Sequence, residues 1–175
     1  MKKKGQKSVH KPQFERPIDQ YFYELDHTFT QGHRGLYAVL LILAFFGVMG
    51  LVWMIPFPRL DFLVRMNAHT FLNWGSFYIA IIVYCYLKLA PTLSYVILIS
   101  IAVMSFFIVQ LEYVERDGGP SVVLICTLIT AVSLIGLWLL SKTEKNVHGK
   151  DFIKLLTIGP IWFWSKVFQK LRWKY

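Results

Sequence analysis

Two histidines stand six residues apart in the stretch YELDHTFTQGHRGLY, residues 23–37, at the edge of a long apolar run. Imidazole is a common metal ligand and the side chain that most readily exchanges protons near neutral pH. His27 and His33 would lie about 120° apart around an ideal helix, and therefore on different faces, unless Gly32 breaks the helix between them. The stretch is consistent with a metal site and with polar residues at a water–lipid boundary.

The elements that must position these histidines are long apolar segments. The chain has 175 residues, of which 55% are hydrophobic, and a mean hydropathy of +0.47. An unbroken apolar stretch of about 20 residues has the length of a helix that crosses a bilayer. The sequence therefore predicts an all-α fold, an integral membrane bundle of about four transmembrane helices. The predicted spans cover residues 36–55, 71–89, 92–111 and 122–140.

The two ends of the chain differ from these spans. Residues 1–20 are basic and polar, so we expect a disordered tail ahead of a single membrane domain, residues 21–175. Residues 18–34 fit either a short interfacial helix or an extension of the first span. In residues 152–173, apolar positions recur at helical spacing against lysines and arginines, which predicts an amphipathic helix in the membrane interface.

The distribution of charge predicts the orientation in the membrane. With four spans, sixteen of the nineteen lysines and arginines fall on the side that carries both termini. Because positive residues concentrate on the cytoplasmic side, both termini are predicted to be cytoplasmic, in a bacterial inner membrane or an endoplasmic-reticulum-type membrane. The net charge of +9 then favours anionic lipid head groups as partners and argues against nucleic acid. Nothing in the sequence indicates an oligomeric state.

This topology sorts the five histidines. His27 and His33 precede the first span, and His148 follows the fourth, so these three share the cytoplasmic side and form the predicted metal site. His69 falls on the opposite side, and His10 lies in the tail. Nearby carboxylates that complete such a set are Glu24, Asp26 and Asp151. Imidazoles with a carboxylate and open coordination positions are typical of non-haem iron.

Other kinds of site receive little support. The sequence contains no GxGxxG, GxxxxGK[ST], HExxH or GxSxG motif. Lys88, close to a span end, is the one charged residue inside the predicted spans, whereas transporters and channels usually carry such residues in mid-membrane. A small transporter is therefore the weakest of the functions considered.

Three segments together carry a family resemblance: WMIPFP (53–58), NWGSFYIAIIVYCYLKLAP (73–91) and KDFIKLLTIGPIWFWSKVFQKLRWKY (150–175). They resemble the family of 2-hydroxy-fatty-acid dioxygenases, and the pattern from Asp151 to Trp162, D-x-x-x-x-L-x-I-G-P-x-W, is the most specific part. The resemblance covers roughly residues 20–175. It implies a membrane protein of about four spans that uses Fe(II) to shorten a 2-hydroxy fatty acid by one carbon.

The histidine blocks depart from the pattern of that family. The first block has the approximate form His-x-x-Pro-x-Asn-x-x-x-His, and His27 matches its first position. Thr30 stands where the proline belongs, His33 is displaced by one residue from the asparagine, and Tyr37 stands near the position of the second histidine. The second block, approximately Gln-Phe-x-Gly-His, is replaced by GLWLLSK at 136–142.

Two functions remain open. Either an iron site is rebuilt from His27, His33 and His148, with Arg34 near the fatty-acid carboxylate, or the iron site is lost and only the fold remains. The alternative function is a non-catalytic membrane protein that binds a lipid or a partner, supported by the basic tails and the C-terminal amphipathic segment.

Overall fold

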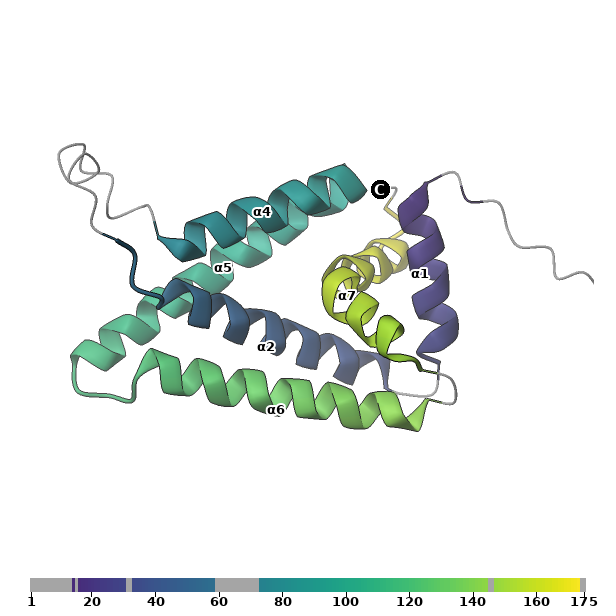
Figure 1. Cartoon of the computed structure of the whole chain (residues 1–175). Coiled ribbons are helices and arrows are strands. Elements are labelled where there is room, and N and C mark those ends of the chain that lie inside the picture. The colour runs from purple at the N-terminus through teal and green to yellow at the C-terminus, as the bar shows by residue number, and fades with distance from the viewer. Residues whose placement is uncertain (1–13, 15, 31–32, 59–72, 145–146, 174–175) are drawn as a thin grey trace, which may run out of the picture.

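The computed structural model describes residues 14, 16–30, 33–58, 73–144 and 147–173. Within these ranges the chain forms only α-helices, which confirms the predicted all-α fold (Figure 1). The helices are α1 (Pro17–Thr28), α2 (Arg34–Trp53), α4 (Trp74–Leu89), α5 (Pro91–Arg116), α6 (Val122–Thr143) and α7 (Gly149–Lys170). His69, His10 and most of the predicted tail lie outside the described residues.

Three of the described helices, α2, α5 and α6, are long and apolar enough to cross a membrane. They contain 20, 26 and 22 residues and are therefore about 30 to 39 Å long, which reaches the ~30 Å thickness of the hydrocarbon core. Helix α4 is apolar but has only 16 residues, about 24 Å, so a fourth complete span stays a prediction.

The outward faces of α5 and α6 carry large apolar side chains. Phe106, Leu128 and Val132 are 60%, 57% and 65% exposed, and many of their neighbours on the same helices are similar. In water such faces would be an association hazard, whereas lipid tails are as apolar as these side chains. The exposed faces and the three long helices together indicate a membrane protein.

Helices α2 and α6 run antiparallel and lie directly against each other (Figure 1). Two glycines of α2 permit this close contact. A Cβ atom at Gly47 would overlap Oγ1 of Thr130 and come within 2.9 Å of the Cys126 carbonyl oxygen, and a Cβ atom at Gly50 would overlap Sγ of Cys126. Small residues at such contacts let membrane helices pack backbone to backbone.

Both terminal helices lie at one end of the bundle, together with the start of α2, the end of α6 and the α4–α5 turn (Figure 1). The opposite end is closed by local contacts: Trp74 Nε1 donates to the Pro56 carbonyl at 3.3 Å, and Val122 N–H donates to Glu115 at 2.9 Å. Helices α1 and α7 therefore lie at the same end of the described bundle. Which side is cytoplasmic stays a prediction.

Helix α1 is a separate helix rather than an extension of the first span. It begins at Pro17, where proline suits the first helical position, and Arg16 pairs with Asp19 at 2.9 Å in its first turn. Residues 17–20, assigned to the tail from the sequence, are therefore helical. The helix buries Ile18 and Phe22, and its main contacts are with α7.

Helix α7 continues through Pro160 without ending. Proline lacks an N–H and disturbs the backbone hydrogen bonds of the preceding turn. The Thr157 carbonyl in that turn accepts a hydrogen bond from the Tyr86 hydroxyl of α4 at 2.7 Å. Helix α7 also packs against α1, α2 and α5, so the predicted C-terminal helix is present but buries one side within the bundle. Its position in the membrane interface stays a prediction.

Candidate functional site

The three histidines of the predicted metal site lie at separate helix ends. His27 is in the last turn of α1, His33 is the N-cap of α2, and His148 is the N-cap of α7. His33 is exposed, and the His148 side chain is 83% exposed with its Nδ1 atom 3.8 Å from Asp151. The break between α1 and α2 removes the fixed helical angle between His27 and His33 but does not bring a third donor to them.

The His27 ring is held within its own helix. Its Nδ1 atom lies 2.8 Å from the Tyr23 carbonyl oxygen, and since a carbonyl only accepts, Nδ1 donates. The ring also lies against the Tyr23 ring, with 3.9 Å between centroids. Among the described residues, no group of three or more His, Cys, Asp or Glu side chains is arranged to hold a metal ion. The iron site from His27, His33 and His148 therefore stays a prediction.

The carboxylates expected beside the histidines make other contacts. Asp26 accepts from Lys166 Nζ at 2.5 Å and from Trp162 Nε1 at 3.1 Å, so both of its oxygens bind α7. Glu24 accepts from Lys154 at 2.6 Å, and this hydrogen bond raises the pKa of Lys154 above its ordinary value of 10.5. These contacts hold α1 on α7.

A buried carboxylate joins the same end of the bundle. Glu144, just after α6, is only 7% exposed and accepts the Thr30 backbone N–H at 3.2 Å. Tyr37 is fully buried, with its ring edge-on to Phe29 at 5.3 Å. Position 37 therefore belongs to the packed core beneath the α1–α2 connection.

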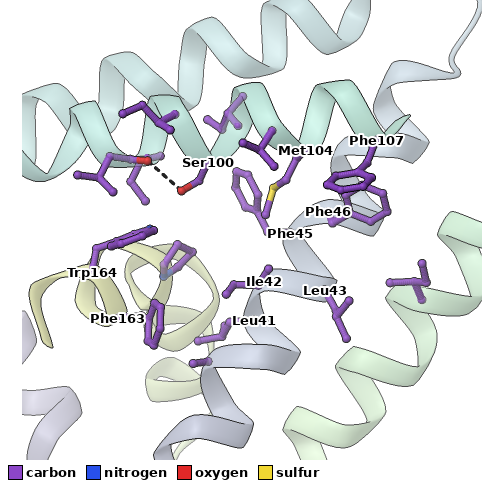
Figure 2. A pocket seen from close by; sticks show the side chains of 18 of the residues that line it. Leu41, Ile42, Leu43, Phe45, Phe46, Ser100, Met104, Phe107, Phe163 and Trp164 are labelled. Atoms are coloured by element: carbon purple, nitrogen blue, oxygen red, sulfur yellow. Dashed lines mark hydrogen bonds between the residues drawn. The ribbon is translucent and has the colours of Figure 1, made fainter. Parts of the chain in front are cut away.

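A large apolar groove opens between α2, α5, α6 and α7, with a volume of about 720 Å³. Figure 2 shows side chains of α2, α5 and α7 converging on it, among them Phe45, Met104 and Phe163. Helix α5 provides a row spaced three or four residues apart, which places its members on one helical face. The row consists of Val96, Ser100, Val103, Phe107, Leu111 and Val114. From first to last it extends about 27 Å along the helix.

Helix α7 forms one end of this groove. Pro160, Phe163 and Trp164 line it, while Gly159 lies so close to α2 that a Cβ atom there would meet Leu41 at 2.8 Å. The opposite side of α7 carries Trp162, the residue bound to Asp26 of α1. The contact with α1 therefore holds one face of α7 in place, and the opposite face of α7 borders the groove.

Three of the residues lining the groove carry a nitrogen or oxygen atom in their side chains: Ser100, Gln110 and Trp164. Ser100 donates to the Val96 carbonyl at 2.9 Å, a bond within its own helix (Figure 2). Gln110 and Trp164 have no side-chain hydrogen bond to any part of the chain that the structure describes. With no charged side chain in its lining, the groove is suited to bind hydrocarbon rather than to transfer protons.

Sequence reasoning missed this groove. Every α5 residue in the row except Val114 belongs to the predicted apolar span 92–111, and so do most other residues of that helix. The pattern of hydrophobicity therefore gives no contrast between a lipid face and a groove face. The one sequence signal is Gln110, an uncharged amide near the end of an apolar span.

No protein-family model, curated protein or solved structure matches the chain. Its fold and groove define an all-helical membrane protein with a lateral apolar groove next to a docked pair of terminal helices. The resemblance to 2-hydroxy-fatty-acid dioxygenases stays a prediction.

Proposed function

We propose that this protein binds one hydrocarbon chain of a membrane lipid in the groove between α2, α5, α6 and α7. The observation that carries the proposal is the groove itself, about 720 Å³ in volume and lined almost entirely by aliphatic and aromatic side chains. This volume lies within the range of about 300 to 1,000 Å³ that is typical of small-molecule sites. Lipid tails are the apolar molecules that surround these helices in a membrane.

The length of the groove supports a single chain. The α5 row extends about 27 Å, whereas one lipid tail spans about 15 Å, half of the ~30 Å hydrocarbon core. A tail that entered from one end would therefore contact the groove along its whole length. A helix from a second copy of the protein is the competing occupant, and the experiment below separates the two.

The test compares two serine variants on α5. Ser100→Phe adds bulk inside the groove, whereas Ser105→Phe makes the same change at a residue that does not line it; both serines donate to the carbonyl four residues earlier at 2.9 Å. We expect displaceable binding of a tritiated long-chain lipid to fall at least tenfold in Ser100→Phe and to persist in Ser105→Phe. Equal binding by the two variants, or a dimer that Ser100→Phe alone dissociates, would contradict the proposal.

A second candidate function is the oxidation of a bound 2-hydroxy fatty acid, as the family resemblance implies. The groove favours an acyl substrate, although the described histidines do not form a ligand set. The test measures bound iron and the loss of a 2-hydroxy fatty acid in membranes containing the wild-type protein or His27→Ala. Iron-dependent turnover that disappears in His27→Ala would establish this activity, and its absence would leave lipid binding alone.

We also propose that both termini are cytoplasmic and that the end of α7 contacts anionic head groups. Lys170 and Arg172 are exposed there, and Trp173 packs on Phe168 at the helix end. Labelling of single cysteines in intact cells tests the orientation: a cysteine at position 170 should be protected from an impermeant reagent, whereas one at Gly118 should react.

A further inference from the structure

We propose that Gln110 recognises an uncharged polar group, such as a hydroxyl, ester or amide, at the end of the hydrocarbon chain in the groove. This inference rests on the proposed function. It adds the class of head group and the direction in which the ligand lies.

Gln110 is an unusual lining residue. Its neighbours along the groove face, Leu111, Val114 and Phe107, are apolar, whereas its amide carries two N–H donors and a carbonyl acceptor. No side-chain hydrogen bond is made to it within the described ranges. Gln110 is exposed on the surface of α5. Where its amide faces hydrocarbon it has no hydrogen-bond partner, which is costly, and a ligand with a polar end would supply that partner.

The position of Gln110 also suits a head group. It lies six residues before the end of α5 at Arg116, about 9 Å along the helix axis. It is therefore near one end of the groove, where the hydrocarbon core gives way to the interface. From Gln110 to Val96 the groove continues for about 21 Å, which is more than the ~15 Å of one lipid tail. The tail then extends toward Trp164 and α7.

The electrostatic surroundings favour an uncharged group over an anion. Asp117, the C-cap of α5, follows Gln110 by seven residues and so lies close to the same side of the helix. The carbonyl end of α5 adds a partial negative charge. Arg116, the single cation in residues 110–124, is placed over the Tyr113 ring at 5.7 Å.

The nearest helix N-terminus does not offset this negative charge. At the start of α6, Val122 N–H already donates to Glu115 at 2.9 Å, and Leu124 N–H donates to the Ser121 hydroxyl at 3.3 Å. A carboxylate or phosphate beside Gln110 would therefore be repelled by Asp117 and by the carbonyl end of α5. Few backbone N–H groups nearby are free to donate to it. A hydroxyl or an amide group can both donate to and accept from the Gln110 side chain, and an ester carbonyl can accept from it.

The competing arrangement places an anionic head group at the other end, beside Trp164. That residue offers one N–H and no acceptor, and the adjacent Lys166 is already bound to Asp26. This arrangement predicts that a fatty acid binds better than an alcohol and that Trp164, rather than Gln110, distinguishes them.

The experiment uses the full-length protein in bilayer discs of zwitterionic lipid at pH 8, with tritiated hexadecylglycerol as the probe. Hexadecanol, hexadecanoate and hexadecane compete at matched concentrations in the membrane. We expect hexadecanol to displace the probe about fivefold more effectively than hexadecane, as one or two neutral hydrogen bonds allow, and more effectively than hexadecanoate. Gln110→Leu should abolish the advantage of the alcohol and leave hexadecane competition unchanged. Gln169→Leu, the same change outside the groove, should preserve that advantage.

Two results would overturn the inference, and they differ in their meaning for the proposed function. If hexadecanoate competes best, or the alcohol keeps its advantage in Gln110→Leu, Gln110 does not recognise the head group, although chain binding stands. If no competitor, hexadecane included, displaces the probe from the wild-type protein, the groove does not bind a chain and both proposals fail.

Discussion

The contact between α2 and α6 predicts a large effect from a very small substitution, Gly47→Ala. The added Cβ atom would lie 2.9 Å from the Cys126 carbonyl oxygen and 3.1 Å from the Thr130 backbone nitrogen, whereas ordinary Cβ contacts begin at 3.4 Å. Both of these partners are backbone atoms, so no side-chain rotation relieves the overlap. The two helices must move apart by about half an ångström, and overpacking of this kind typically costs about 1–3 kcal/mol.

Gly50→Ala creates a different overlap, and this difference makes the prediction sharp. Its Cβ atom would overlap only Sγ of Cys126, because the next atoms are at 3.4 and 3.8 Å. Removing the sulfur in Gly50→Ala/Cys126→Ala should therefore recover most of the lost stability. Gly47→Ala/Thr130→Ala should recover only part, because the Cys126 carbonyl oxygen remains in place.

The assay is unfolding in mixed micelles with increasing mole fraction of dodecyl sulfate, followed by circular dichroism. Gly35→Ala is the matched control, since a Cβ atom there has no neighbour within 4 Å and alanine favours a helix by about 0.5–1 kcal/mol over glycine. We expect Gly47→Ala to lose about 2 kcal/mol and Gly35→Ala to lose none. Equal stability of these two variants, or failure of Cys126→Ala to rescue Gly50→Ala, would refute the close packing of α2 on α6.

Three further predictions concern the end that carries α1 and α7. Asp26→Asn should weaken α1 docking by about 1.5 kcal/mol, because a charged hydrogen bond is lost, and amide exchange in residues 17–28 should become roughly tenfold faster. Tyr86→Phe should cost about 1 kcal/mol in the micelle assay by removing the bond to α7, whereas Tyr84→Phe, at an exposed position, should cost little. The folded-state pKa of Lys154 is raised, so its contribution to stability is complete below pH 10.5 and is lost as the pH rises through the higher folded-state value. The stability difference between the wild type and Lys154→Met should therefore shrink only above pH 10.5, and a difference that shrinks between pH 7 and 9 would contradict it.

The sequence predicted the helices well because long apolar runs bounded by prolines, glycines and charges leave few alternatives. Helix α2 was expected at 36–55 and spans Arg34–Trp53, and α6 was expected at 122–140 and spans Val122–Thr143. Helix α5 was expected to end at 111, but it continues to Arg116. The prediction stopped short because the last turn of α5 is polar and lies beyond the apolar run. Hydropathy marks the part of a helix inside the membrane and not its full length.

The contacts between helices were far less predictable. The acids of α1 were expected near a metal, yet Asp26 and Glu24 bind lysines 140 and 130 residues further along the chain. Pairing over such separations depends on which helix faces meet, and a single sequence does not contain that information. The groove was missed for the same reason, since Phe45 and Phe163 are indistinguishable from core or lipid-facing residues until α2 and α7 are placed together.

The most direct test of the central claim is photo-crosslinking in membranes with a long-chain alcohol that carries a diazirine near its tail, followed by mass-spectrometric mapping of the adducts. We expect adducts concentrated on groove residues such as Phe45, Met104 and Phe163, and we expect excess unlabelled hexadecanol to remove them. Lipid-facing residues such as Val132 and Ile135 should give weak adducts that do not compete. Adducts spread evenly over both sets, with no competition at either, would contradict a lipid-binding groove.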